Sequence, residues 1–256
     1  MPDLGLPLPD GTRLVLLAER PDLRGPLGDH NVSVWPEFML HSAVANRNWD
    51  LLFEIWPDYQ LVLVGADDRI LAAHNSAPLA LDGTEAGLPD GWEDQFEWSV
   101  AQRRDGIEPT ALGALQIVVG LDRQGTGLAG TMLSAMRANA RARGLSPVIA
   151  CVRPTLKPAY PLTAIDRYAA WTRDDGLPFD PWIRLHVRIG GRIVRPSPRS
   201  MTITGTVADW KSWTEMAFPE SGDYVVPGAC EPVRIDREAD LGTYHDPNVW
   251  IVHALG

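Results

Sequence analysis

The sequence predicts an α/β protein in which helices and strands form layers around a central sheet. The order of the elements carries this prediction, because apolar runs and amphipathic stretches follow one another as strand, helix, hairpin, helix, strand, glycine-rich loop and helix. An early hairpin requires antiparallel neighbours, so a regular doubly wound series of parallel strands does not fit. The chain is organised around residues 114–143, where an apolar strand passes through the glycine loop into a helix.

The first 60 residues predict one strand and one helix. Residues 1–34 are rich in Pro, Gly and Asp around a single apolar run at 13–17, which is typical of a strand. A helical pattern begins at Pro36 and ends at Pro57, because proline suits the first turn of a helix but not its interior. The apolar face of this helix comprises Phe38, Met39 or Leu40, Val44, Leu51, Leu52 and Ile55.

A hairpin and a second helix precede the central strand. The apolar runs at 59–64 and 70–74 are separated by the turn-forming residues 65–68. A helix is predicted over 91–106, where apolar side chains recur every four residues, at Trp92, Phe96 and Val100.

The central strand at 114–119 and the helix after it enclose the most informative loop of the chain. The helix has an apolar stripe and is ended by Gly144; the stripe comprises Leu128, Met132, Leu133 and Met136. Loop 124–129 therefore presents backbone N–H groups without intrahelical partners at the positive end of a helix. Such an end favours an anion, typically a phosphate.

Two common phosphate-binding motifs do not account for this loop. A P-loop ends in Lys followed by Ser or Thr, whereas Leu128 and Ala129 stand here. The G-x-G-x-x-G spacing is present at Gly125, Gly127 and Gly130, but the acidic residue about 20 positions later that a dinucleotide fold requires is absent. A strand-to-helix turn without a ligand stays open as the simplest alternative.

The loop resembles the signature of the GNAT superfamily of N-acyltransferases. Gln124-x-x-Gly127-x-Ala129 matches the pattern Q/R-x-x-G-x-G/A, and Val119 stands five residues before Gln124, as the strand valine of the family does. The resemblance implies a mixed, mostly antiparallel central sheet with helices on both faces and a splayed central pair of parallel strands. It is close over residues 112–153 and looser elsewhere.

The resemblance also implies which residues hold an acyl-CoA. The backbone of the central strand would pair with the pantetheine arm through Ile117, Val118 and Val119. The loop and the first helical turn would bind the pyrophosphate through Gln124, Gly125, Thr126, Gly127, Leu128, Ala129 and Gly130. The thioester carbonyl is expected on the N–H of Val119 or Gly120, where a fixed donor stabilises developing negative charge.

The second half of the chain predicts more strands around one long loop. Residues 147–152 form a short strand, which in the family runs parallel to the central strand and splays from it. Loop 154–182, rich in prolines and aromatics, is either a lid or acceptor wall, or a surface loop pinned by its rings. Further strands are expected near 201–205, 224–226, 233–235 and 249–252, with a helix around 207–216. The expectation is one GNAT-like domain over 1–256, with a C-terminal elaboration from about residue 200.

A candidate acid lies on the helix that follows the long loop. Asp180 is a preferred N-cap, and the motif L-H-x-x-I-G at 185–190 stands where many family members have L-Y-x-x-L-G. His186 therefore takes the place of the tyrosine that commonly protonates the departing CoA thiolate. Imidazole ordinarily titrates near neutral pH, which suits this role. The family's upstream asparagine is absent, since Phe179 and Asp180 stand there.

The other catalytic groups are less defined. The central strand offers only Gln116, which cannot accept a proton, so Glu93, Glu97 or Asp122 acting through water are the candidate bases. Cys151 is a conceivable nucleophile, but burial would raise its pKa and a structural thiol is favoured. The remaining histidines show no metal-ligand spacing, so no metal is expected.

Composition limits the partners. A formal charge of −10 over 256 residues argues against general nucleic-acid or membrane binding. The two cysteines lie far apart, no run approaches about 18 apolar residues and the N-terminus lacks a signal pattern, so a cytoplasmic protein is expected. A local basic patch for CoA phosphates is expected from Arg123, Arg137, Arg141, Arg143, Arg153 and Lys157.

Together these features predict an N-acyltransferase that moves an acetyl or other short acyl group from an acyl-CoA to a small-molecule amine. The expected cosubstrate is acetyl-CoA or another acyl-CoA, with no metal. The alternatives are a thioester decarboxylase or hydrolase on the same fold, an acyltransferase with a carrier-protein or aminoacyl-tRNA donor, and a non-catalytic acyl-CoA sensor. A carrier protein or a second copy in a homodimer are the candidate macromolecular partners.

Overall fold

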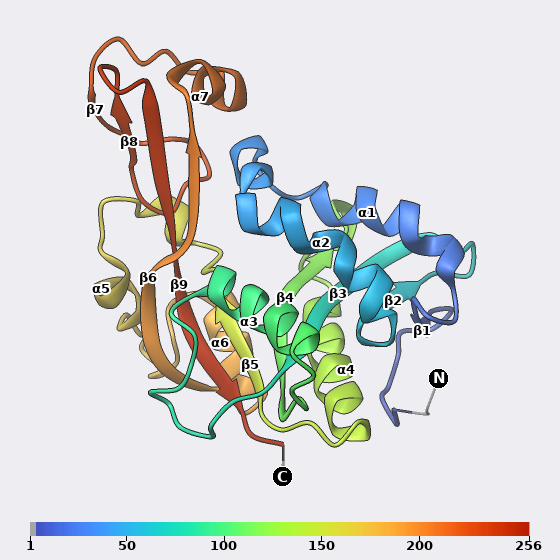
Figure 1. Ribbon diagram of the computed structural model, residues 1–256. Helices are drawn as coiled ribbons and strands as arrows, with labels where there is room; N and C mark the ends of the chain where they lie inside the picture. The colour runs from blue at the N-terminus through green and yellow to red at the C-terminus, as the bar shows by residue number, and fades with distance from the viewer. Residues whose placement is uncertain (1–3, 256) are drawn as a thin grey trace.

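The computed structural model describes residues 4–255, which include one sheet of nine strands (Figure 1). The strands are β1 (Arg13–Leu16), β2 (Leu61–Val64), β3 (Ile70–Leu79), β4 (Ala111–Val119), β5 (Val148–Val152), β6 (Arg192–Gly205), β7 (Gly222–Tyr224), β8 (Val233–Asp236) and β9 (Leu241–His253). They lie in the order β1-β2-β3-β4-β5-β9-β8-β7, with β6 paired to β9 off this path. Of the described pairs, only β4 and β5 run parallel. The predicted mixed, mostly antiparallel sheet is confirmed.

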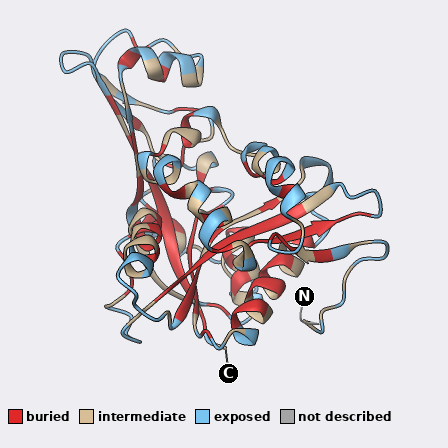
Figure 2. Cartoon of the chain, turned by 45° about the vertical axis from the view of Figure 1, so that its right-hand side comes forward, coloured by how far each residue is buried: buried red, intermediate tan, exposed pale blue. Residues whose placement is uncertain are grey.

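Helices cover both faces of this sheet, as predicted. They are α1 (Arg24–Val32), α2 (Ala43–Ile55), α3 (Trp92–Arg104), α4 (Leu128–Ala142), α5 (Ile165–Ala169), α6 (Pro181–Arg188) and α7 (Val207–Thr214). Adjacent residues of a strand point to opposite faces. Accordingly Ala72 of β3 packs with Met132 of α4, whereas Ala73 packs with Leu27 of α1. Buried residues concentrate in the strands between these layers (Figure 2).

The N-terminal helices differ from the prediction. α1 lies in a stretch whose glycines and proline lower helix propensity, but Leu23 and Leu27 pack beneath the sheet and tertiary contacts stabilise the helix. The single helix expected from Pro36 is divided at Ser42 into a 3-10 turn, Glu37–His41, and α2. The Ser42 hydroxyl accepts a hydrogen bond from the N–H of Ala45 at 3.2 Å, so this residue caps a new helix.

Two of the C-terminal strands, β6 and β9, are longer than expected, and β7 lies at Gly222–Tyr224 where a strand was expected at 224–226. β6 and β9 rise together beyond the rest of the sheet, and β7, β8 and α7 lie at their far end (Figure 1). The prediction placed this strand near 201–205 only, and the observed β6 includes Pro196 and Pro198, which are unfavourable inside a strand. The pairing of β6 with β9 shifts register between Ser197 and Met201, which accommodates this interruption.

The long loop after β5 is pinned by its own aromatic rings. Four side chains pack ring to ring with centroids 5.0–6.2 Å apart, and the Tyr168 hydroxyl donates to Asp180 at 2.9 Å. The cluster comprises Tyr160, Tyr168, Trp171 and Phe179. These contacts favour the pinned surface loop over a lid. Within residues 4–255, no helix is long and apolar enough to cross a membrane.

Candidate active site

The site is centred where β4 and β5 part. The two strands pair only over residues 112–114 and 148–150. On its other edge β4 shifts register against β3, so Leu115 has no opposite residue and forms a β-bulge. A bulge bends the strand that carries it. β4 therefore turns away from β5 just past Ala114, and a wedge opens between them, as expected for a splayed parallel pair.

Side chains of α3 hold this bulge in place. Trp92 Nε1 donates to the carbonyl oxygen of Leu115 at 2.7 Å, and Gln95 Nε2 donates to that of Ala114 at 3.1 Å. Both carbonyls lie where β4 leaves β5, at residues that lose the regular hydrogen-bond partners of the sheet. Neither side chain was predicted to support the site, because nothing in the helical pattern indicates that its polar atoms reach a particular strand carbonyl.

Two of the three predicted strand residues, Ile117 and Val119, have backbone groups on the open edge of β4. The N–H of Gly120 donates to the carbonyl of Leu71 on the β3 side at 3.0 Å. Since hydrogen-bonded pairs alternate along an antiparallel ladder, the N–H and C=O of Val119 and Ile117 face away from β3. Val118 instead faces β3, and His30 Nε2 lies 3.4 Å from its carbonyl oxygen. The expectation that Gly120 holds a thioester carbonyl is wrong, because its N–H is already used.

The glycine loop is an exposed arc of backbone before α4. Gly125 and Gly127 have φ of 77° and 89°, a region that favours glycine. A Cβ built on either would meet no described atom within 4 Å, so the space above the loop is open. The N–H groups of Gly125, Thr126 and Gly127 have no hydrogen-bond acceptor among the described residues. The arc can therefore accept an anion at the N-terminus of α4.

Three of the six cations expected to form a basic patch around this loop lie elsewhere: Arg137, Arg143 and Lys157. Arg137 points into the interior, where its Nη1 donates to the Ile189 carbonyl at 2.7 Å. Arg143 lies at the far end of α4, stacked 4.8 Å from the Tyr59 ring, and a 15-residue helix spans about 22 Å. Lys157 is buried against the carbonyls of Tyr160 and Cys230. These cations are close in sequence, but in the fold each contacts a different part of the protein.

One continuous cleft of about 600 Å³ joins the open edge of β4 to the space beneath the N-terminal helices. One half contains the predicted strand residues 117–119 together with Gln124, Ala129 and His186. Its other half is lined mainly by aromatic and polar side chains, among them Asn31, Trp35, Trp49, Trp92, Asp50 and Asp246. The cleft can thus hold an extended ligand and a second, smaller one end to end.

Comparison with known proteins places the chain in a family. It is 32% identical to the arginine N-acetyltransferase avaD of Aspergillus versicolor, over 98% of this chain and 97% of that protein. The loading GNATL domain of CurA from Lyngbya majuscula superposes with a TM-score of 0.59 at 16% identity, covering 95% of this chain and 97% of that domain. The chain belongs to the GNAT superfamily.

Further comparisons agree on the fold. The GphF GNAT-like decarboxylase, solved with isobutyryl-CoA, superposes with a TM-score of 0.58 at 18% identity, covering 96% of this chain and 99% of that one. No family model matches the chain. The relative that is 32% identical and named an arginine N-acetyltransferase supports the predicted class of enzyme, an N-acyltransferase.

His186, which stands in place of the GNAT tyrosine, lines the cleft from α6. It is only 1% exposed, and burial, with the neighbouring His253 second, lowers its pKa to about 3. Its Nδ1 lies 2.9 Å from His253 Nε2, while its own Nε2 has no partner among the described residues. The ring is therefore neutral at pH 7, so the near-neutral titration that motivated its choice does not apply in this environment.

The three carboxylates predicted as bases do not line the GNAT cleft. Glu97 pairs with Arg47 at the surface, and Asp122 pairs with Arg69. Glu93 is closer: it accepts from the Ser42 hydroxyl at 2.7 Å and the Thr202 N–H at 3.0 Å. Burial raises its pKa, and its hydrogen bonds counteract this. Its two bonds tie α3 to the N-terminus of α2 and to β6, which is a structural arrangement.

Sequence reasoning missed Asp246, a fully buried carboxylate at the cleft wall. Its Oδ1 accepts from Arg153 Nε at 2.8 Å and from the Tyr244 hydroxyl at 2.5 Å. The signal available was three polar residues, His245, Asp246 and Asn248, inside what is now β9, but a strand was expected only from residue 249. The guanidinium of Arg153 also donates to the Gly228 carbonyl at 2.7 Å, so the C-terminal segment takes part in building the site.

Cys151 also lines the cleft but is not activated. Its Sγ lies 3.1 Å from the Ser200 hydroxyl, and burial raises its pKa to about 12. A thiol that stays protonated is a poor nucleophile, which supports the structural interpretation. In the described part of the chain, no group of three or more His, Cys, Asp or Glu side chains could hold a metal ion.

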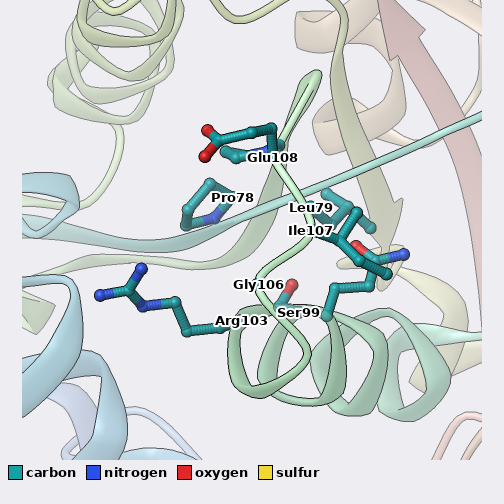
Figure 3. Close-up of a pocket in the computed structure, with 9 residues that line it drawn as sticks. Pro78, Leu79, Ser99, Arg103, Gly106, Ile107 and Glu108 are labelled. Carbon is teal, nitrogen blue, oxygen red and sulfur yellow. The ribbon is translucent and has the colours of Figure 1, made fainter.

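A second cavity, of about 100 Å³, lies apart from this chemistry (Figure 3). It is formed where the loop after α3 passes the end of β3, with Pro78, Leu79 and Ile107 around it. Arg103 and Glu108 are its charged members, and neither histidine nor cysteine contributes. It is too small for a cosubstrate, so the main cleft is the candidate active site.

Proposed function

We propose that the protein transfers an acetyl group from acetyl-CoA to a small cationic amine of the arginine type. The observation that carries the proposal is the cleft that joins an unpaired strand edge and a glycine arc to a chamber lined by aromatic rings and two carboxylates. The first two features suit an acyl-CoA, and the chamber suits an organic cation. The relative that is named for arginine acetylation supports the choice of acceptor.

The donor would lie along β4 with its phosphates at α4. The unpaired N–H and C=O groups of Ile117 and Val119 would pair with the amides of the pantetheine arm, as an added strand would. The pyrophosphate would bind the N–H groups from Gln124 to Gly130 at the helix N-terminus. Binding by backbone groups explains why the cationic side chains expected around the loop are dispensable.

The acceptor would occupy the far half of the cleft. Asp246 and Asp50 are the acidic members of its lining among the described residues. Asp246 is paired with Arg153, which also lines the cleft, and Asp50 lies 3.4 Å from Arg24 at the surface. Trp35 and Trp49 offer ring faces, which attract a guanidinium or ammonium group. An amine held there approaches the splay of β4 and β5 from the side opposite to the glycine arc.

The reaction would then depend mainly on positioning. The neutral amine nitrogen attacks the thioester carbonyl carbon, the C–S bond breaks, the amine loses one proton and the departing thiolate gains one. The N–H of Val119 or Ile117, unlike that of Gly120, is free to stabilise the carbonyl oxygen. His186 is proposed as the side chain that meets the departing sulfur.

Two experiments test this function. Calorimetry should show acetyl-CoA binding, and mass spectrometry should show an acetylated product when arginine is the acceptor. Malonyl-CoA and acetyl-CoA incubated with and without amine separate the alternatives: loss of CO₂ without transfer would indicate a decarboxylase, and binding without turnover on any amine would indicate a sensor. Unchanged turnover of His186→Ala would remove His186 from the mechanism.

The remaining expectations are also proposals. We infer a single domain, which the continuous nine-stranded sheet supports. A cytosolic location is supported by two free, buried thiols, Cys151 and Cys230. A carrier protein or a second copy of the chain stays a prediction, to be tested by gel filtration with light scattering.

A further inference from the structure

Two histidines from distant parts of the chain share one hydrogen bond beside the cleft. His186 lies on α6 and His253 ends β9, and their facing nitrogens, Nδ1 and Nε2, are 2.9 Å apart. Both residues are almost wholly buried. At this distance one nitrogen must carry a proton and the other must not, because two bare nitrogens would repel each other and two protonated ones would clash.

The backbone is shaped to allow this contact. Gly191, between α6 and β6, donates its N–H to the His186 carbonyl at 2.8 Å. A Cβ on Gly191 would lie 2.7 Å from that carbonyl oxygen and 2.7 Å from His253 Cε1. Such contacts require something to shift, so the absence of a side chain at this position lets the two rings meet. The pairing is therefore built into the fold.

Two proton arrangements can satisfy the pair. In the first, His253 Nε2–H donates to His186 Nδ1, so His186 carries its own proton on Nε2 and His253 Nδ1 is bare. In the second, His186 Nδ1–H donates to His253 Nε2, so His186 Nε2 is bare and His253 carries a proton on Nδ1. The outer nitrogens, His186 Nε2 and His253 Nδ1, have no hydrogen-bond partner among residues 4–255.

The surroundings of His253 favour the first arrangement. Each arrangement leaves one outer N–H without an acceptor among residues 4–255, which costs about 1–3 kcal/mol. His186 lines the cleft, where a ligand can accept its N–H, whereas His253 is not part of the lining, so only the first arrangement can avoid this cost. Arg137 is the charged group that, after burial, lowers the pKa of His253, so the ring of His253 is held neutral. Arg137 is itself held by the Ile189 carbonyl at 2.7 Å, at the end of α6.

We propose that His253 is a positioning residue that holds His186 as the tautomer with its proton on Nε2, so that His186 presents an N–H donor to the acyl-transfer cleft. This inference rests on the proposed function and makes the role of His186 specific, because the ring keeps its proton and stabilises the departing thiolate by a hydrogen bond. The thiolate then takes its proton from solvent water, which also receives the proton that the amine loses. A neutral ring can do this at pH 7, where an imidazolium is not populated. Removing a donor aimed at developing charge typically costs about 10²–10³ in kcat.

The test compares two substitutions at His253 with a control elsewhere on β9. His253→Gln retains an N–H donor for His186 Nδ1, whereas His253→Met has similar bulk and no donor. His245→Gln is the matched control, because His245 lies on the same strand and bonds to Thr202 at 3.1 Å, away from His186. Thermal unfolding and acetyl-CoA calorimetry establish that each variant folds and binds the donor.

Nitrogen NMR of the histidine rings gives a readout that does not require turnover. The His186 signals are assigned by their loss in His186→Phe. We expect Nε2 to be protonated in the parent and in His253→Gln, and a mixture of tautomers in His253→Met. In the same series kcat should fall about tenfold or more in His253→Met, in the range seen for residues that orient a reactive histidine, with KM for acetyl-CoA within about twofold.

The outcomes separate this inference from the proposed function. A proton on His186 Nδ1 in the parent, or an unchanged tautomer in a folded His253→Met protein, would overturn the positioning role even if the enzyme acetylates arginine. The expected tautomers in a protein that acetylates no amine would instead uphold the pairing and overturn the proposed function. A loss of kcat in His253→Gln equal to that in His253→Met would also contradict the role, because the donor is retained.

Discussion

Replacing Gly127 with valine tests whether the glycine arc binds the cosubstrate. Gly127 has φ of 89°, and an L residue in this left-handed region costs about 1–2 kcal/mol. Gly144, at the other end of α4, provides a matched control: its φ is 71°, and a Cβ there also meets no described atom within 4 Å. Gly127→Val and Gly144→Val should therefore lower the unfolding temperature alike, by about 2–4 °C per kcal/mol for a chain of this size.

Only Gly127→Val should weaken acetyl-CoA binding. The side chain would enter the open space above the arc and turn N–H groups that would otherwise face the pyrophosphate. A hydrogen bond to a charged group contributes about 1.5–3 kcal/mol, and each 1.4 kcal/mol is about tenfold in Kd, so the loss of one such bond should raise Kd at least tenfold. Calorimetry at one temperature measures both variants. Equal Kd values for the parent and the two folded variants would refute the assignment of the arc.

Three further predictions concern single contacts. Asp246→Asn should destabilise the fold by about 3–5 kcal/mol, because it leaves the buried Arg153 guanidinium unpaired; chemical denaturation should show partial recovery in the double variant with Arg153→Gln. Trp92→Phe should lower kcat and cost about 1–3 kcal/mol, since the buried Leu115 carbonyl loses its donor; unchanged kinetics would mean that the bulge needs no support. His74 is fully buried, and burial lowers its pKa to about 3, so the unfolded chain binds the proton first and stability falls as pH drops from about 6.5 toward 3. Chemical denaturation measures the free energy of unfolding at pH 7 and at pH 5. Between these two pH values, His74→Leu should lose about 2 kcal/mol less of this free energy than the parent does.

The central part of the fold and the donor side of the site were predictable because their signals are local. The strand at β4, the turn at Gly125 and Gly127 and the stripe of α4 each depend on neighbouring residues. Steric freedom of glycine and helical periodicity act over a few positions, so a short window of sequence contains them. The same locality made the hairpin of β2 and β3 and the helix α3 predictable.

The prediction failed where contacts between distant segments decide the structure. The length of β6 and β9 results from their pairing with each other, which outweighs Pro196 and Pro198. The cations grouped by sequence around the glycine loop are drawn to separate acceptors, such as the Ile189 carbonyl for Arg137. Glu93 seemed available as a base, but Ser42 and the Thr202 N–H occupy it.

The sequence by itself determined the family, the glycine arc and the placement of His186 on the wall of the main cleft, since each depends on residue types at fixed spacing. Only the tertiary structure decided how that histidine is used. Burial makes the His186 ring neutral, and His253, 67 residues away along the chain, supplies its hydrogen-bond partner. The burial of a side chain and its hydrogen-bond partner depend on segments that are distant in sequence and meet only in the fold. A pattern within a short stretch of sequence does not show which segments these are.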